Sequence, residues 1–442
     1  MIRLRKFIVP LLFILVGLLT APWEGDQKWI WRGMILYSIP LACYLSNSFK
    51  AKEVGILVGA CTLMQALASP FLLDKVTLRD YITLKPNFHK VINVKEGVVS
   101  GIEGDQAYTT DEKGFRVTKK INYKNKPENV LRVFAIGSST VEGMLLGDQV
   151  NWPHLLQQRL SLTLTKNQVE VINAGKSASS SRNHLATFLQ ILKYKPDIAI
   201  FLMGGNDWGH HIKSSQNQKH FFDKLTSKLG LRLSTRAKEN LSILRTAMRF
   251  DNTLIAEIIK TFKNSLKKKR APKENILHTS FSGGSITTSM DSLNRSDKRV
   301  FLPTQVSSEY RYFISKIGDT CKKNKLVCIF ANQPTAYNTN ATDKIKSKFW
   351  VTPHNESYTL DFNSMIHISS MYNQFIMSYA LDNNIFPCDV SGGIPPTLDY
   401  LWDDIHFNIG GAKKAGEIIF ECTIQALDID SLTHENSKQS KS

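Results

Sequence analysis

The chain has 442 residues, 42% of them hydrophobic, which is enough for one large domain or two ordinary ones with a substantial core. A formal net charge of +18 suits a protein that meets nucleic acid, an anionic lipid surface or an anionic polysaccharide. No signature of a nucleic-acid-binding fold accompanies this charge, and the densest basic cluster, at 267–270, follows an apolar-periodic helix. We therefore predict no nucleic-acid partner.

The first 76 residues hold most of the long apolar runs and are predicted to form a transmembrane region. Three segments, at 7–23, 29–45 and 54–73, have the composition of membrane-spanning helices, and the last has 20 consecutive uncharged residues. Basic residues at 3–6 and 50–52 fall on one side if all three cross. This predicts a multi-pass membrane protein with the rest of the chain on the extracytoplasmic side. A soluble or membrane-surface hairpin is the alternative.

The remaining chain divides into a polar connector at 77–127 and a long region where apolar strands alternate with helices. We expect strands at 131–136, 168–173, 197–203, 326–332 and 385–390, and helices at 152–164, 182–194, 306–324, 364–383 and 411–427. Such alternation is typical of a parallel α/β sheet. The pattern predicts one α/β domain over 128–428, with a helical insertion at 212–300 and a disordered tail at 429–442.

Small polar residues follow apolar stretches at four places in this domain. They are the GSS segment at 137–139, the NAG segment at 173–175, the GGND segment at 204–207 and the DDIH segment at 403–406. In this order they resemble the four blocks of the SGNH/GDSL hydrolase superfamily. A Gly-Phe-Arg segment at 114–116 resembles that of a bacterial cell-envelope subgroup. The resemblance implies a flavodoxin-like three-layer α/β fold in a bacterial inner-membrane protein, and ester hydrolysis without a cofactor.

Ester hydrolysis by a serine requires a base for its proton and a group that orients the base. Ser139 is the candidate nucleophile, His406 the candidate base, and Asp403 the carboxylate that holds the imidazole. Asp and His three residues apart on a turn or helix lie on one side of it. Asp404 is one residue away from that spacing, so we do not assign it a catalytic role.

The resemblance also implies an oxyanion hole built from the backbone N–H of Ser139, a backbone N–H of the second block and the side-chain amide of Asn206. In the second block, Ala178 stands where the family has glycine, and Gly175 lies three residues earlier, so both remain candidates. A positive φ at this position would strain Ala178. Ser138 stands where the family often has Asp.

Histidines and cysteines give weaker signals. His210 and His211 are adjacent and therefore point in different directions, and no partner has ligand spacing, so we predict no metal. Outside the cytoplasm, the four later cysteines would allow three disulfide pairings, and buried free thiols are the alternative. These cysteines are Cys321, Cys328, Cys388 and Cys422.

The predicted function is that of a membrane-anchored serine esterase acting on acyl esters, with O-acetyl groups of envelope polysaccharide or glycolipid as the expected substrates. Two alternatives use the same chain differently. An O-acyltransferase would pass the acyl group from Ser139 to a sugar hydroxyl instead of water. A non-catalytic envelope protein would keep the fold for carbohydrate binding or assembly. The oligomeric state is left open.

Overall fold

The computed structural model describes residue 56 and residues 80–165, 168–215, 277–281, 290–353 and 356–439. The segments predicted to span a membrane lie outside this set apart from residue 56, and so does most of the insertion predicted at 212–300. Within the described ranges, no helix has both the length and the apolar character needed to cross a bilayer. The described residues from 80 onward belong to one compact unit, and all four sequence blocks lie within it.

A five-stranded parallel sheet forms the centre of this unit. Its strands lie in the order β10-β8-β5-β3-β4, which is the flavodoxin-like order and confirms the predicted parallel α/β sheet. Every residue of the two central strands β3 and β5 is buried, as expected for strands covered on both faces. The five strands are β3 (Val130–Gly137), β4 (Gln168–Asn173), β5 (Ile198–Leu202), β8 (Val327–Ala331) and β10 (Phe386–Cys388).

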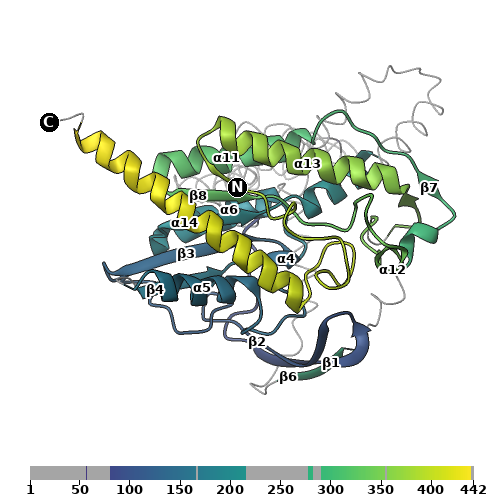
Figure 1. Ribbon diagram of the computed structural model, residues 1–442, viewed down its shortest axis with the longest axis horizontal. Coiled ribbons are helices and arrows are strands. Elements are labelled where there is room, and N and C mark those ends of the chain that lie inside the picture. Colours follow the sequence, from purple (N-terminus) through teal and green to yellow (C-terminus); the bar gives the residue numbers. More distant parts are fainter. Residues whose placement is uncertain are drawn as a thin grey trace, which may run out of the picture. The chain divides into compact units, whose positions relative to one another are not determined.

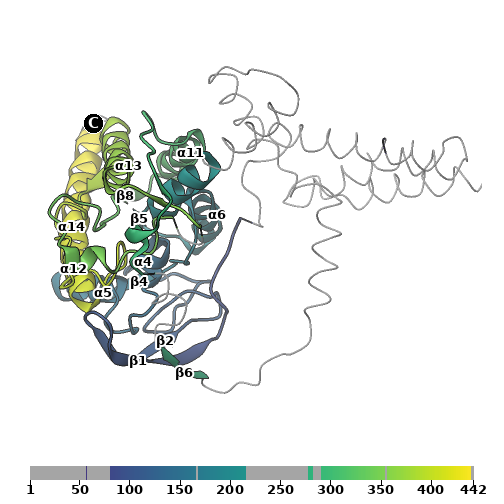
Figure 2. The same ribbon diagram turned by 90° about the vertical axis from the view of Figure 1, so that its right-hand side faces the viewer.

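Helices cover both faces of the sheet, as Figures 1 and 2 show. Helix α5 (Trp152–Thr163) packs with α14 (Ile409–Gln439), and α6 (Ser181–Ile191) packs with α11 (Ser308–Asn324). In Figure 2 these two pairs lie on opposite sides of the strands. Helix α13 (Phe362–Asp382) contacts β8 and β10, and the turn η1 (Leu192–Tyr194) continues α6.

The predicted connector contains a β-hairpin that the sequence analysis missed. Strands β1 (His89–Val99) and β2 (Ile102–Thr109) are antiparallel, and β6 (Leu277–Phe281) adds to β1 in parallel. Only a few positions of the hairpin are buried, so its charged residues mask the alternation that indicates a strand. Its turn lies against the start of α14, where the backbone N–H of Ile409 donates to Gly101 O at 3.4 Å.

Two further expectations need correction. The later part of the predicted helical insertion contains strands β6 and β7 (Lys298–Arg299) and the 3-10 turn η3 (Ser292–Asn294). The strands pair with β1 and with β9 (Thr359–Leu360), so partners distant in sequence decide their conformation. The predicted disordered tail is helical as far as Gln439, because no Gly or Pro interrupts α14 after its packed first half.

Covalent and ionic links fasten the layers together. The four later cysteines form disulfides Cys321–Cys328, between α11 and β8, and Cys388–Cys422, between β10 and α14. At the amino end of β3, the guanidinium of Arg132 lies 2.8 Å from the carboxylate of Glu170 on β4 and is fully buried. It also donates to the carbonyl oxygens of Tyr194 at 2.7 Å and Asn122 at 2.9 Å.

Candidate active site

The candidate nucleophile lies where β3 ends. Ser138 is the N-cap and Ser139 the first residue of the short helix α4 (Ser139–Glu142). The preceding Gly137 has no room for a side chain, since a Cβ there would lie 2.3 Å from Val141 Cγ2 and 2.5 Å from the carbonyl oxygen of Leu202. The chain therefore turns tightly between β3 and α4. The strand order reverses between β3 and β5, and ligands of open α/β sheets bind at this position.

The structure brings Ser139, His406 and Asp403 together in one hydrogen-bonded chain. Ser139 Oγ lies 2.8 Å from His406 Nε2, and His406 Nδ1 lies 2.7 Å from Asp403 Oδ2. The other oxygen, Asp403 Oδ1, accepts the backbone N–H groups of Ile405 at 2.9 Å and His406 at 2.6 Å. The segment is thus a turn closed by the aspartate itself, which fixes the carboxylate against the imidazole.

The electrostatic surroundings of His406 favour its protonated form. Burial disfavours the imidazolium, but the charge and hydrogen bond of Asp403 outweigh this, with smaller contributions from Asp404 and Glu142. The pKa of His406 is therefore raised above its ordinary value of 6.5. An imidazole of this kind is a stronger base for the proton of a serine hydroxyl.

Asp404 is as deeply buried as Asp403, but its hydrogen bonds go to other groups. Its Oδ2 accepts the hydroxyl of Tyr337 at 2.7 Å and the backbone N–H groups of Val351 at 2.8 Å and Trp350 at 3.3 Å. Burial, and next the charge of Asp403, raise the pKa of Asp404 to about 7. The two adjacent carboxylates therefore accept hydrogen bonds from different groups, Asp403 from His406 and Asp404 from Tyr337 and the backbone at 350–351.

The two backbone candidates of the second block for the oxyanion hole, Gly175 and Ala178, have different surroundings in the structure. The N–H of Gly175 donates to Asn173 Oδ1 at 2.9 Å, and a Cβ on Gly175 would lie 2.3 Å from the backbone nitrogen of Glu142. Gly175 is therefore a close-packing position and not an oxyanion donor, which corrects that expectation. Ala178 is exposed, in a turn, with φ at +63°, so a non-glycine residue occupies a left-handed conformation there.

Asn206 is the second of the helical residues 205–215 that follow β5. Its Nδ2 donates to the carbonyl oxygen of Ser179 at 2.8 Å, beside Ala178. This bond uses one of the two N–H groups of the amide and orients the other. The arrangement therefore links the second and third blocks of the sequence at the carboxyl edge of the sheet.

Comparison with known proteins places these residues in a family. The model of the GDSL-like Lipase/Acylhydrolase family matches residues 135–414, which include every candidate residue named above. The chain belongs to this family. As a GDSL-like protein it is a hydrolase of ester bonds.

Solved structures of GDSL-like and related esterases resemble the chain. A putative lipolytic protein of the G-D-S-L family from Desulfitobacterium hafniense is 14% identical, with a TM-score of 0.33, over 66% of this chain and 98% of its own. A carbohydrate acetylesterase family member from Sinorhizobium meliloti is 12% identical, with a TM-score of 0.32, over 67% and 99%. An acetylxylan esterase from Geobacillus stearothermophilus is 11% identical, with a TM-score of 0.33, over 67% and 93%. No curated protein matches.

One glutamate that sequence reasoning missed ties the helix of the candidate nucleophile in this GDSL-like hydrolase to the second block. Glu142, three residues after Ser139, is buried in α4. Its Oε1 accepts the hydroxyl of Tyr108 on β2 at 2.7 Å, and its Oε2 accepts the backbone N–H of Ser177 at 2.5 Å. The carboxylate thus joins α4 to the turn that carries Ala178.

Arg116, the last residue of the Gly-Phe-Arg segment, holds the backbone that follows Ser139. It is buried and donates to the carbonyl oxygens of Glu142 at 2.5 Å, Gly143 at 2.9 Å and Leu146 at 2.8 Å. It also pairs with Asp148 at 2.7 Å. The Gly-Phe-Arg resemblance was the only sequence signal for this role, and it gave no indication of the partners.

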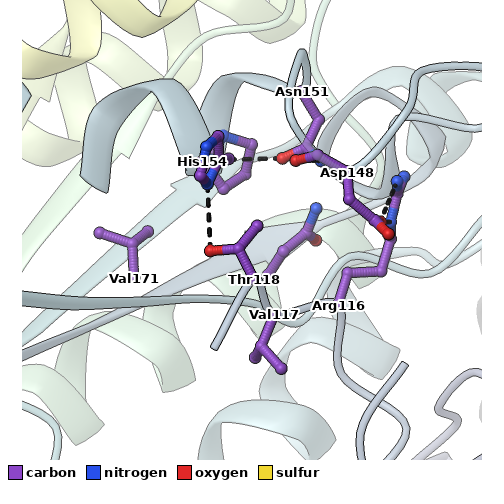
Figure 3. Close-up of a pocket in the computed structure, with 9 residues that line it drawn as sticks. Arg116, Val117, Thr118, Asp148, Asn151, His154 and Val171 are labelled. Carbon is purple, nitrogen blue, oxygen red and sulfur yellow. Dashed lines mark hydrogen bonds and ion pairs between the residues drawn. The ribbon is translucent and has the colours of Figure 1, made fainter. Parts of the chain in front are cut away.

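Beside Arg116 lies a small polar recess that is separate from the hydrogen-bonded chain of Ser139 (Figure 3). In Figure 3, Arg116 points to Asp148, and the imidazole of His154 points to Thr118, with Nδ1 3.1 Å from Oγ1. Neither Ser139 nor His406 lines the recess. The recess therefore does not include the candidate nucleophile or the candidate base.

The second of the two adjacent histidines after Asn206, His211, contacts aromatic side chains. His211 Nδ1 lies 3.1 Å from the hydroxyl of Tyr372, and its ring packs edge-on against Phe301. Burial lowers the pKa of His211 to about 4, so the ring is neutral and packs against Phe301 and Tyr372. Across the described ranges, no three His, Cys, Asp or Glu residues are grouped as metal ligands.

Proposed function

We propose that Ser139, His406 and Asp403 are the catalytic triad of a membrane-anchored serine esterase. The observation that carries this proposal is the continuous chain from Ser139 Oγ to His406 Nε2, at 2.8 Å, and from His406 Nδ1 to Asp403 Oδ2, at 2.7 Å. With Nδ1–H donating to Asp403, Nε2 is the acceptor for the serine proton. This is the arrangement that makes a hydroxyl nucleophilic at neutral pH.

The reaction proceeds in two acyl transfers. Ser139 Oγ attacks the ester carbonyl while its proton moves to His406 Nε2, and Asp403 stabilises the imidazolium. His406 then returns the proton to the leaving alcohol as the ester bond breaks, which leaves an acyl group on Ser139. Water, deprotonated by His406, attacks this acyl-enzyme, and the proton passes back to Ser139 as the acid departs.

The developing oxyanion needs donors at the carboxyl edge of the sheet. We assign this role to the backbone N–H groups of Ser139 and Ala178 and to the second N–H of the Asn206 amide. The bond from Asn206 to Ser179 and the left-handed turn at Ala178 support this assignment, since both fix these donors before the substrate arrives. Each such donor typically contributes a factor of about 10²–10³ to the rate.

The proposed substrate is an acyl ester, foremost an O-acetyl group, on envelope polysaccharide or glycolipid. The apolar segments before residue 76 support a membrane anchor, and the two disulfides support a catalytic domain outside the reducing cytoplasm. A net charge of +18 suits anionic polysaccharide or lipid at such a surface.

The catalytic assignment is tested on the full-length chain in detergent micelles with a serine-reactive fluorophosphonate probe. Labelling of the parent that vanishes in Ser139→Ala supports the triad. Ser138→Ala is the matched control, because the neighbouring serine makes no side-chain capping bond and should remain dispensable for labelling. A folded parent that is not labelled, or equal loss in both variants, overturns the assignment.

Substrate and location need separate measurements. Acetate release from O-acetylated polysaccharide by the parent, and not by Ser139→Ala, supports the substrate class. Protease treatment of spheroplasts that express the full chain tests the location. Digestion of the catalytic domain in intact spheroplasts supports an extracytoplasmic position, and full protection contradicts it.

A further inference from the structure

One tryptophan in the long segment before α13 contacts both of the adjacent carboxylates. The indole Nε1 of Trp350 donates to Asp403 Oδ2 at 2.6 Å, and its backbone N–H donates to Asp404 Oδ2 at 3.3 Å. Asp403 Oδ2 is also the oxygen that accepts His406 Nδ1. The oxygen that orients the catalytic base is therefore shared between an imidazole and an indole.

The rings around the base are aligned as well as bonded. The indole of Trp350 lies within 20° of the plane of the His406 imidazole, with ring centroids 6.1 Å apart. The ring of Trp402 lies within 15° of it at 5.1 Å. Trp350 is only 8% exposed, so water competes weakly for the shared oxygen. Among these two tryptophans, only Trp350 donates to Asp403.

Asp404 fixes the segment that carries Trp350. Its Oδ2 accepts the hydroxyl of Tyr337 and the backbone N–H of Val351, and its backbone carbonyl accepts the N–H of Ala336 at 2.8 Å. Both the beginning and the end of the stretch from 336 to 351 are thereby tied to one buried residue. Because Asp403 and Asp404 are consecutive, the stretch cannot shift relative to Asp404 without moving the indole away from Asp403.

We propose that Trp350 is a positioning residue of the hydrolytic reaction, whose indole N–H holds the Asp403 carboxylate against His406, and that Asp404 holds Trp350 in place. This inference rests on the proposed triad. A second donor on the shared oxygen removes the freedom of the carboxylate to rotate. Trp350 therefore acts through Asp403 and does not contact the reacting atoms.

The test is the variant Trp350→Phe, which keeps an aromatic ring and removes the donor. We expect kcat for a small chromogenic acetate ester to fall about 10- to 100-fold with KM unchanged, the usual consequence of losing a hydrogen bond to a charged group. Ser139→Ala is measured alongside. If Ser139→Ala turns over like the parent, the triad fails and this inference fails with it. If only Trp350→Phe equals the parent, the inference alone is overturned.

The pH profile separates positioning of Asp403 from a loss of packing. The charged groups that act on His406 are Asp403, Asp404 and, from α4, Glu142. Without the indole donor, Asp403 is no longer held against His406 and stabilises the imidazolium less, so the acid limb of kcat/KM should move to lower pH, toward the ordinary histidine value. A loss of packing that left Asp403 on His406 would leave the acid limb where it is in the parent, and an unmoved acid limb overturns the inference.

A second measurement covers the case in which Trp350→Phe does not fold. In Trp402→Phe, Trp350 is the remaining tryptophan of the described residues whose ring stacks on His406. We expect one indole N–H resonance of this variant to lie far downfield and to titrate with the midpoint of the acid limb. The absence of a titrating indole resonance overturns the inference.

Discussion

A buried ion pair between an arginine and a carboxylate lies near each end of strand β3, and the two pairs serve different purposes. At the amino end, Arg132 pairs with Glu170 and donates to two carbonyl oxygens of neighbouring loops. At the carboxyl end, Arg116 pairs with Asp148 and donates to three carbonyl oxygens directly after the nucleophile. One arginine fastens the base of the sheet, and the other fixes backbone that carries chemistry. The role of a buried arginine in an ion pair therefore depends on which backbone segments its remaining hydrogen bonds hold.

The largest expected effect belongs to the carboxyl end. Asp403→Asn should lower kcat about 10⁴-fold, because an amide does not hold the imidazole in the tautomer that accepts the serine proton. The fold should persist, since the amide oxygen can still accept the two backbone N–H groups of the turn. The assay is ester hydrolysis with circular dichroism as the control for folding. Asp404→Asn should lose much less, and equal losses would contradict the division between the two carboxylates.

The variant Arg132→Met tests the ion pair at the amino end of β3 by itself. It should lower the free energy of unfolding by about 3–5 kcal/mol, because Glu170 is left buried without its partner. Chemical denaturation measures this loss. The kcat per folded molecule should stay within about twofold, since no catalytic group lies at this end of β3. Replacing Glu170 by Leu in the same chain should recover part of the stability. A tenfold loss of kcat would remove the distinction between the two ends.

Arg116→Met is the matched change at the other end. We expect a similar loss of stability and, in addition, a fall in kcat of about 10- to 100-fold, because small displacements of catalytic groups are costly. The affected backbone runs from Glu142 to Leu146, directly after Ser139. Rate measurements at low temperature, where the variant stays folded, separate the two effects. A normal kcat would show that Arg116 serves stability alone, as Arg132 does.

The smallest effect is expected at the turn of the second block. Ala178→Gly should raise the free energy of unfolding by about 0.5–1 kcal/mol, because glycine adopts the φ of +63° without strain and this outweighs its greater freedom in the unfolded chain. Thermal unfolding measures the change, with Ala174→Gly on the same segment as a destabilising control. Destabilisation by Ala178→Gly would show that the turn is not strained.

Much of the sheet could be predicted because its strands are continuous apolar runs. Strand β4 has the predicted bounds 168–173, and the other strands of the parallel sheet differ by one to a few residues at their ends. Strands β1 and β2 were missed because they are partly exposed, and β6 was missed because it takes its pairing from the distant β1. Periodicity detects a buried face, and β1 and β2 bury too little of theirs to show one.

The candidate site was predictable where short motifs carry it and unpredictable where it depends on tertiary contacts. Ser139, Asn206, Asp403 and His406 all lie in recognisable blocks. Trp350, Glu142 and Arg116 have no motif that names their partners, and Trp350 reaches Asp403 across 53 residues of sequence. Gly175 misled because the glycine is required by the backbone of α4 and not by a ligand.

The hydrogen bond between Ser139 and His406 joins residues 267 positions apart. At ribosomal speeds of about 5–20 residues per second, the serine leaves the ribosome roughly 13–53 s before the histidine does. During this interval the nascent chain carries an inert hydroxyl. Under the proposed triad, hydrolytic activity therefore arises only after His406 has left the ribosome, and a product truncated before residue 403 has neither the proposed base nor its aspartate.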